Sequence, residues 1–178
     1  MRAEYKAALD LREQLFTLAQ RAQDPALLLV AHDVLGDTLF WLGEFATARE
    51  HLEQGIALYN AQQYRSHAFL YGYDSGVACL TFVAHALWHL GYPEQALKRI
   101  HEALTLAPEL SHPPSLAHAL YFAAQLHQYR REGRSAQELA AEVIKVSTDQ
   151  GFPFWLALGV GCEGEERRDS GRLRWSRR

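Results

Sequence analysis

The sequence predicts an all-α fold in which helical hairpins stack side by side, an α-solenoid. Two observations carry this prediction. Apolar residues recur at the 3.6-residue spacing of amphipathic helices through most of the 178 residues. In residues 82–108 two such patterns flank the tight turn Gly91-Tyr92-Pro93, where the proline suits the first position of a second helix. Because one hairpin cannot bury its apolar side alone, several must pack together.

The central hairpin follows the spacing of the tetratricopeptide repeat. Small and bulky residues take the positions that this pattern requires, and a proline closes it: Ala84, Leu87, Ala96, Ile100, Ala103 and Pro108. Leu80 and Val83 replace the leading Trp-x-x-Leu of the pattern. We therefore expect tetratricopeptide-like αα-hairpins that stack into a right-handed superhelix.

The same arrangement occurs before and after this hairpin. Upstream it occupies Leu35, Gly36, Leu39, Phe45, Ala48, Leu52 and Gly55, and downstream Ala136 takes the place of Ala96. The turns at Gly43 and Gly91 lie further apart in the chain than the roughly 34 residues of the simplest repeat. The sequence therefore predicts unequal repeats with long connections between the hairpins.

Taken in order, the pattern predicts a repeat domain over residues 1–158. A single helix at 3–23 resembles the second half of a hairpin, complete hairpins follow at about 25–60, 75–108 and 114–150, and a fourth starts at 153. Residues 60–75 have the least regular pattern, so they either extend a helix or form an irregular excursion. From 159 to 178 Gly and Arg dominate and the apolar period stops. This change predicts an irregular tail that is disordered or comes from a shifted reading frame.

Composition excludes several classes of protein. A hydrophobic content of 48% excludes a disordered chain, and a net charge of −3 gives no basic face for nucleic acid. The longest apolar stretch is interrupted by His85 and His89, so we expect no membrane span. The N-terminus lacks the apolar core of a signal peptide, and Cys79 and Cys162 are too few for a disulfide framework. We expect a cytoplasmic protein without a cofactor.

Motifs of catalysis are absent from the sequence, which contains no GxSxG, no GxxxxGK[ST] phosphate loop and no HExxH. We therefore expect a protein that is not an enzyme. His85 and His89, four residues apart, are a weak candidate for a metal pair, with His118 as a third ligand. The alternative, which we favour, is that these histidines are solvated residues of a groove that holds no metal.

In tetratricopeptide arrays the first helices of successive hairpins line a concave groove. The matched positions in this chain are Asp33, Asp37, Phe40, Trp41, Thr81, His85, Trp88, His89, His118, Tyr121, Gln125, Gln128 and Tyr129. Their spacing of about four places each set on one side of its helix. The groove would be aromatic, polar and weakly acidic, and without Lys or Arg it should not clamp a chaperone's C-terminal carboxylate. The alternative is that Trp41, Trp88 and Tyr121 pack as ordinary core.

Several longer phrases resemble the repeat region of bacterial signalling proteins that combine a class III adenylate cyclase domain, a nucleotide-binding ATPase module and a tetratricopeptide array. The phrases are GDTLFWLGEFATAREHLEQGIALY, YGYDSGVACLTFVAHALWHLGYPEQAL, ALYFAAQLHQYRRE and GFPFWLALG. The resemblance covers roughly residues 11–159. It implies that cyclase and ATPase chemistry would lie N-terminal to this region, and neither motif occurs in the sequence.

Together these observations favour a non-catalytic interaction module, a piece of a regulatory ATPase or cyclase protein, that binds a peptide, a neighbouring domain or a second copy of itself. Unpaired apolar sides at the first helix and at Phe154 favour dimers. A small-ligand sensor, with the groove aromatics enclosing an effector, is the alternative. A gene fragment without independent function is a further one.

Overall fold

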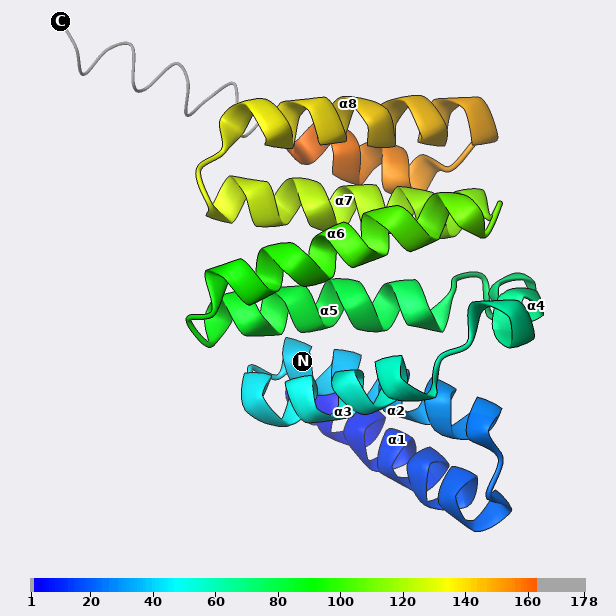
Figure 1. Cartoon of the computed structure of the whole chain (residues 1–178). Helices are drawn as coiled ribbons and strands as arrows, with labels where there is room; N and C mark the ends of the chain where they lie inside the picture. The colour runs from blue at the N-terminus through cyan, green and yellow to red at the C-terminus, as the bar shows by residue number, and fades with distance from the viewer. Residues whose placement is uncertain (1, 163–178) are drawn as a thin grey trace, which may run out of the picture.

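The structure, a computed structural model, describes residues 2–162, with side chains for 9–64 and 68–162. Between residues 2 and 162 the chain is helical with short connections and contains no strand. The helices are α1 (Arg2–Ala22), α2 (Pro25–Trp41), α3 (Phe45–Leu58), α4 (Ala61–Tyr71), α5 (Ser75–His89), α6 (Pro93–Glu109), α7 (Pro113–Tyr129) and α8 (Gly133–Gln150). A further helical segment covers residues 153–162. Figure 1 shows these helices stacked from α1 at one end to α8 at the other, so the predicted all-α array is confirmed.

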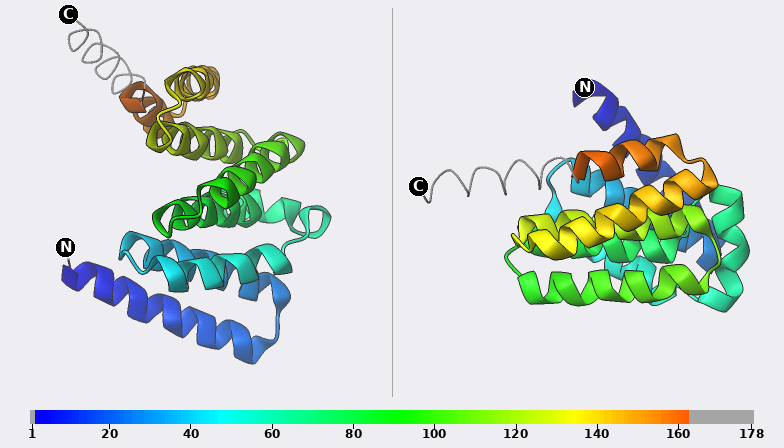
Figure 2. Two further views of the ribbon diagram at one scale, coloured as in Figure 1. Left: turned by 60° about the vertical axis from the view of Figure 1, so that its left-hand side comes forward. Right: turned by 90° about the horizontal axis from the view of Figure 1, so that it is seen from above.

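Three helical hairpins form the stack, α2–α3, α5–α6 and α7–α8. The first helices α2, α5 and α7 pack against one another, and α3 and α6 each pack against the first helix of the next hairpin. Helix α1 packs on α2 in the same way, so it takes the place of a hairpin's second helix. Successive hairpins are turned relative to one another, as the left view of Figure 2 shows.

The hairpins share one turn geometry. The second residue after each first helix has a positive φ, 85° at Gly43, 85° at Gly91 and 60° at Arg131. In the central turn the amide of Tyr92 donates to the carbonyl of Leu87 at 2.9 Å, and the equivalent hydrogen bonds close the other two turns. Glycine adopts this backbone conformation without steric cost, whereas arginine does not.

Aspartate side chains fix where two of the first helices begin. Asp24 accepts a hydrogen bond from the amide of Ala26 at 2.8 Å at the start of α2. Asp74 accepts one from the amide of Val77 at 3.0 Å at the start of α5, and the Tyr59 hydroxyl also donates to it at 3.0 Å. These caps satisfy amide groups that have no partner within the helix.

The interpretation of residues 60–75 as a helix extension or an irregular excursion is wrong, because α4 is a separate helix. Asn60 caps it by accepting a hydrogen bond from the amide of Gln62 at 3.0 Å, and Gly72 ends it with φ of 81°. Figure 1 shows α4 to one side of the stack, at the end where α5 begins. It fills the long connection between the first two hairpins.

The predicted tail also begins later than residue 159, since the helical segment continues to residue 162. Gly159 is buried against α8, where a Cβ atom would lie 3.0 Å from Val143 Cγ1. Cys162 is buried as well. The apolar side of this segment therefore continues through Gly159, where the apolar pattern of the sequence stops. The rest of the tail, 163–178, lies outside the described residues.

The core runs along the stack between first and second helices. Val83 and Leu87 of α5 and Ile100 of α6 are completely buried at its centre. Small residues let the helices approach closely: a Cβ at Gly36 would lie 2.6 Å from Leu52 Cγ. Among the residues that the structure describes, no helix is long and apolar enough to cross a membrane.

Candidate functional site

The first helices α2, α5 and α7 bring their C-terminal turns together. The ring centroid of Phe40 lies 5.9 Å from that of His89, which lies 6.1 Å from that of Tyr129. Residues from three hairpins, far apart in the sequence, thus meet on one side of the stack. In Figure 1, α2 and the segment 153–162 lie behind α3 and α8, on the same side of the molecule.

Several aromatic side chains on these helices remain open to solvent. Trp41 is 59% exposed and Tyr129 is 43% exposed, and His89 is exposed between them. Trp88 is half-buried and stacks on Tyr129, with ring centroids 6.2 Å apart. His89 stacks on Phe45 at 4.4 Å, with the ring planes 10° apart.

The aromatic surface continues toward the segment 153–162. Tyr121 of α7 is half-buried and lies 5.9 Å, between ring centroids, from Trp155. Gln125 donates to the Tyr121 hydroxyl at 2.8 Å, and Gln128 donates to the carbonyl of Cys162 at 3.0 Å. We call the partly exposed rings the aromatic face: Trp41, Trp88, His89, Tyr121, Tyr129 and Trp155.

A second set of the predicted groove residues forms a buried layer. Its members are Asp33, Phe40, Thr81, His85 and His118. Two further rings belong to this layer and were missed by the sequence analysis: Phe82 contacts Phe40 at 5.6 Å and Phe122 at 5.0 Å, between centroids. Helical spacing was the available signal, because Phe82 lies three residues before His85 and Phe122 four after His118. This layer holds the first helices together and supports the exposed rings.

The buried histidines act as neutral hydrogen-bond donors. His85 Nε2 donates to the carbonyl of Phe122 at 2.9 Å. His118 Nε2 donates to Thr81 Oγ1 at 2.9 Å, because the Thr81 hydroxyl itself donates to the carbonyl of Ala78. Burial lowers the pKa of His85 to about 4 and that of His118 to about 3, so both rings are uncharged at neutral pH.

An acidic pair lies on α2 with one cation opposite. Arg12 of α1 forms an ion pair with Asp37, with Nη1 3.1 Å from Oδ1, and also contacts Thr38 Oγ1 and the carbonyl of Val34. Burial raises the pKa of Asp37, and Arg12 opposes that shift. Burial raises the pKa of Asp33 to about 8, against hydrogen bonds from Ser75 and Tyr73 that favour the charged form.

The geometry does not favour the weak metal candidate at His85 and His89. His85 Nε2 already donates to a backbone carbonyl, and its ring is buried. The ring of His89 instead stacks on Phe45. His118, the third ligand considered, points Nε2 at Thr81. Among the side chains of residues 9–64 and 68–162, no group of three or more His, Cys, Asp or Glu is placed to hold a metal ion.

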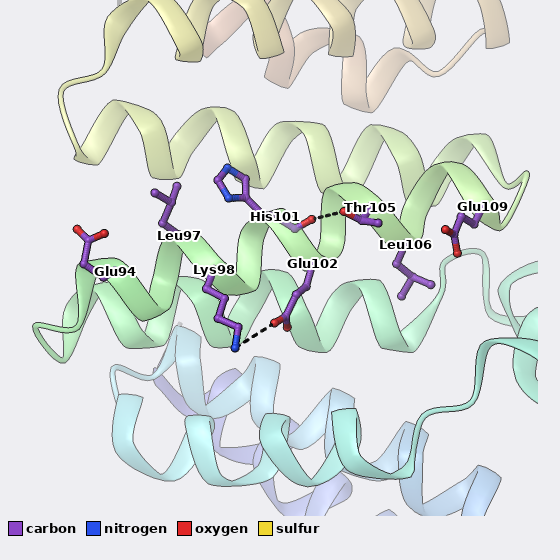
Figure 3. A pocket seen from close by; sticks show the side chains of 8 residues that line it. All are labelled: Glu94, Leu97, Lys98, His101, Glu102, Thr105, Leu106 and Glu109. Carbon is purple, nitrogen blue, oxygen red and sulfur yellow. Dashed lines mark hydrogen bonds and ion pairs between the residues drawn. The ribbon is translucent and has the colours of Figure 1, made fainter.

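Two surface depressions lie away from the aromatic face. One follows the outer side of α6, where Figure 3 shows eight lining residues that all come from this helix. Two of its charged residues pair along the helix, Lys98 with Glu102 at 4.0 Å. The other follows the outer side of α1, between Asp10 and Arg21. Neither brings side chains from different elements together, and neither has the compact polar-aromatic shape that a small-ligand sensor would need.

Comparison with solved structures identifies the type of fold. No protein family and no curated protein matches the sequence. Among solved structures, the chain is similar to the nearly identical tetratricopeptide-like repeats of a Podosopora anserina kinesin light chain, with a TM-score of 0.61 and 19% identity over 99% of this chain and 87% of that one. A variant of the same repeats gives a TM-score of 0.62 at 18% identity, covering 99% of this chain and 86% of the variant. The apo form of RapI gives 0.55 at 14% identity, covering 96% of this chain and 65% of RapI. The chain therefore has a tetratricopeptide-like fold.

Proposed function

We propose that this protein is a non-catalytic interaction module whose aromatic face binds an extended segment of a partner protein. The observation that carries the proposal is the row of solvent-open rings, Trp41, His89 and Tyr129, contributed by three successive hairpins. Exposed aromatic residues that lie together across several elements are typical of binding surfaces, since each ring buries a large area at little cost in side-chain entropy. The tetratricopeptide-like fold supports a scaffold of this kind.

The chemistry of the face favours a partner segment with apolar and cationic residues. None of the predicted groove positions carries Lys or Arg. Arg12, which reaches this side from α1, is engaged by Asp37. Tryptophan and tyrosine faces attract guanidinium and ammonium groups as well as prolines and aliphatic side chains. We therefore expect no selection for a free C-terminal carboxylate.

Selection of peptides from a random displayed library tests this proposal. We expect selected peptides to lose about tenfold or more in affinity for Trp41→Ala and for Tyr129→Ala, because truncation of an aromatic anchor removes a large part of the binding energy. Phe69→Ala is the matched control, since Phe69 is 68% exposed but lies on α4. Peptides that bind all three variants equally would contradict the proposal.

We further propose that the module acts within a regulatory protein that carries cyclase or ATPase domains. The support is the resemblance of four long phrases of the sequence, which span most of the chain. Translation of the DNA on both sides of the gene in all frames tests this context. Cyclase and ATPase sequences upstream would support it, and unrelated genes on both sides would contradict it.

We also propose that the protein binds a second copy of itself. Leu11, Leu15 and Leu18 form an exposed apolar row on α1, and Phe154 is exposed on the segment 153–162. Exposed apolar rows of this kind mark contact surfaces. Light scattering over a wide range of concentrations should detect dimers that Leu11→Glu with Leu18→Glu abolishes, whereas a monomer at every concentration would contradict self-association.

A further inference from the structure

A pair of histidines joins the two helices of the first hairpin. His32 of α2 and His51 of α3 face one another with their Nδ1 atoms 3.1 Å apart and their ring centroids 5.2 Å apart. The two residues are 19 positions apart in the sequence, so the hairpin itself brings them together. This pair is not part of the aromatic face, because His32 lies nearer the start of α2 than Trp41 does.

The surroundings of the pair keep both rings uncharged. Phe16 of α1 contacts both rings edge-on, with centroids 4.8 Å from His32 and 5.4 Å from His51. Burial, together with repulsion by His51, lowers the pKa of His32 to about 4. Burial also lowers the pKa of His51, although Glu50 opposes that shift. The neutral imidazole is the form that binds metal ions.

We propose that His32 and His51 form a two-histidine site for a divalent first-row transition-metal ion such as Zn²⁺. Two imidazole nitrogens bound to a tetrahedral zinc ion at about 2.0–2.1 Å lie about 3.3 Å from one another. The 3.1 Å between the two Nδ1 atoms is close to this spacing. Both rings are half-buried rather than enclosed, so an ion can reach them and the rings can tilt toward it.

Binding needs a change of tautomer in one ring and a tilt of both rings toward the ion. In the free pair one Nδ1 carries the proton that it donates to the other Nδ1. When the ion binds, that proton leaves Nδ1 for solvent and the Nε2 atom of the same ring takes one up. Each ring then keeps one proton on Nε2 and offers the Nδ1 lone pair to the metal, and no proton is released overall.

The ligand set decides which ions this site takes. Imidazole nitrogen suits zinc, nickel and copper, whereas magnesium and calcium require oxygen ligands. Since the described residues provide no third protein ligand, water fills the remaining positions. The bound metal would then link α2 to α3 and stabilise the end of the stack to which α1 is attached.

Calorimetric titration of the tag-free full chain with zinc chloride at neutral pH tests the proposal. We expect one zinc ion per chain and a rise in the unfolding temperature, because a ligand that binds only the folded state stabilises it. His32→Gln and His51→Gln should each weaken binding by more than the roughly tenfold that loss of an outer partner costs. His101→Gln is the control, since His101 is an exposed histidine on α6, and magnesium chloride should give no binding.

Three results would overturn the proposal: no zinc binding up to millimolar concentration, equal binding by His51→Gln and the unsubstituted chain, or equal loss in His101→Gln. Circular dichroism identifies a variant that fails to fold. Nitrogen NMR of the histidine rings gives a test that needs no variant. Zinc should shift two Nδ1 resonances together, and a spectrum unchanged at saturating zinc contradicts the site.

Discussion

At the scale of single residues, the carboxyl of Asp33 couples folding to pH. Burial raises its pKa to about 8, and within the described residues its Oδ2 atom has no hydrogen-bond partner. A carboxyl with a raised pKa keeps its proton in the folded chain after the unfolded chain has lost it. Its contribution to stability is therefore complete below about pH 4 and is lost as the pH rises through about 8.

Asp33→Asn should reduce this loss of stability, because asparagine has nearly the same shape and does not titrate. We expect the free energy of unfolding to fall less between about pH 6 and about pH 9 in the variant than in the unsubstituted chain, by at least about 1.4 kcal/mol, the value of one pKa unit. Urea unfolding at both pH values measures the difference. Equal losses in the two chains would show that Asp33 is ionised in the folded state.

Arg131 is a second residue whose backbone conformation affects the stability of the fold. It adopts φ of 60° in the turn that glycine occupies in the other two hairpins. Arg131→Gly should raise the free energy of unfolding by about 1 kcal/mol, since the left-handed conformation is unfavourable for residues with a Cβ. Gly43→Ala is the reciprocal control and should cost a similar amount through backbone strain alone, because nothing lies within 4 Å of the added methyl. A destabilised Arg131→Gly would contradict this account of the turn.

At the scale of helices, close packing between hairpins depends on small residues. A Cβ at Gly55 of α3 would lie 2.7 Å from Cys79 Sγ of α5, and Cys79 is fully buried. We expect Gly55→Ala to destabilise the fold by about 1–3 kcal/mol, the usual cost of overpacking a core. Thermal and urea unfolding measure it.

Gly161→Ala provides the comparison for that substitution. Gly161 lies in the helical segment 153–162 and nothing lies within 4 Å of an added methyl, so alanine should be neutral or stabilise by up to about 1 kcal/mol. If Gly55→Ala is as stable as Gly161→Ala, α3 and α5 pack less closely than the structure shows.

The sequence predicted the main helices because their apolar positions recur every three to four residues and Gly or Pro marks most turns. Helix α4 was not predicted, since most of its polar residues come first and most of its apolar residues come last, so that it has no clear apolar side, although Asn60 and Gly72 could have served as cap signals. The continuation of the last helical segment through residue 162 was also missed, because Gly159 is buried through backbone contact and leaves no apolar side chain to detect.

The sequence predicted which positions belong to the first helices, but it did not predict which of these residues are exposed and which are buried. Helical spacing placed Trp41, His85 and Tyr129 on first helices, yet burial depends on how the hairpins are turned. In the structure His85 is buried and donates to the carbonyl of Phe122, whereas Tyr129 is open to solvent. His32 and His51 escaped notice because their separation in the sequence matches no metal-binding motif.

At the scale of the whole molecule, the stack of hairpins turns separate aromatic residues into one surface. The first helices all end at the same edge of the stack, so the rings on the last turn of each helix lie beside the rings of its neighbours. The buried layer of Phe40, Phe82 and Phe122 fixes these turns relative to one another. The central claim is that this preformed face, rather than the outer sides of α1 and α6, binds the extended peptide segment of the partner protein.

NMR mapping of a bound peptide on the ¹⁵N-labelled chain tests this claim most directly. A peptide selected on the protein should shift the indole N–H of Trp41 and the backbone amides in the last turns of α2, α5 and α7. Amides along the outer side of α6, from Glu94 to Glu109, should stay unchanged. Shifts concentrated on α6 or on the outer side of α1 would contradict the claim and place the binding surface elsewhere.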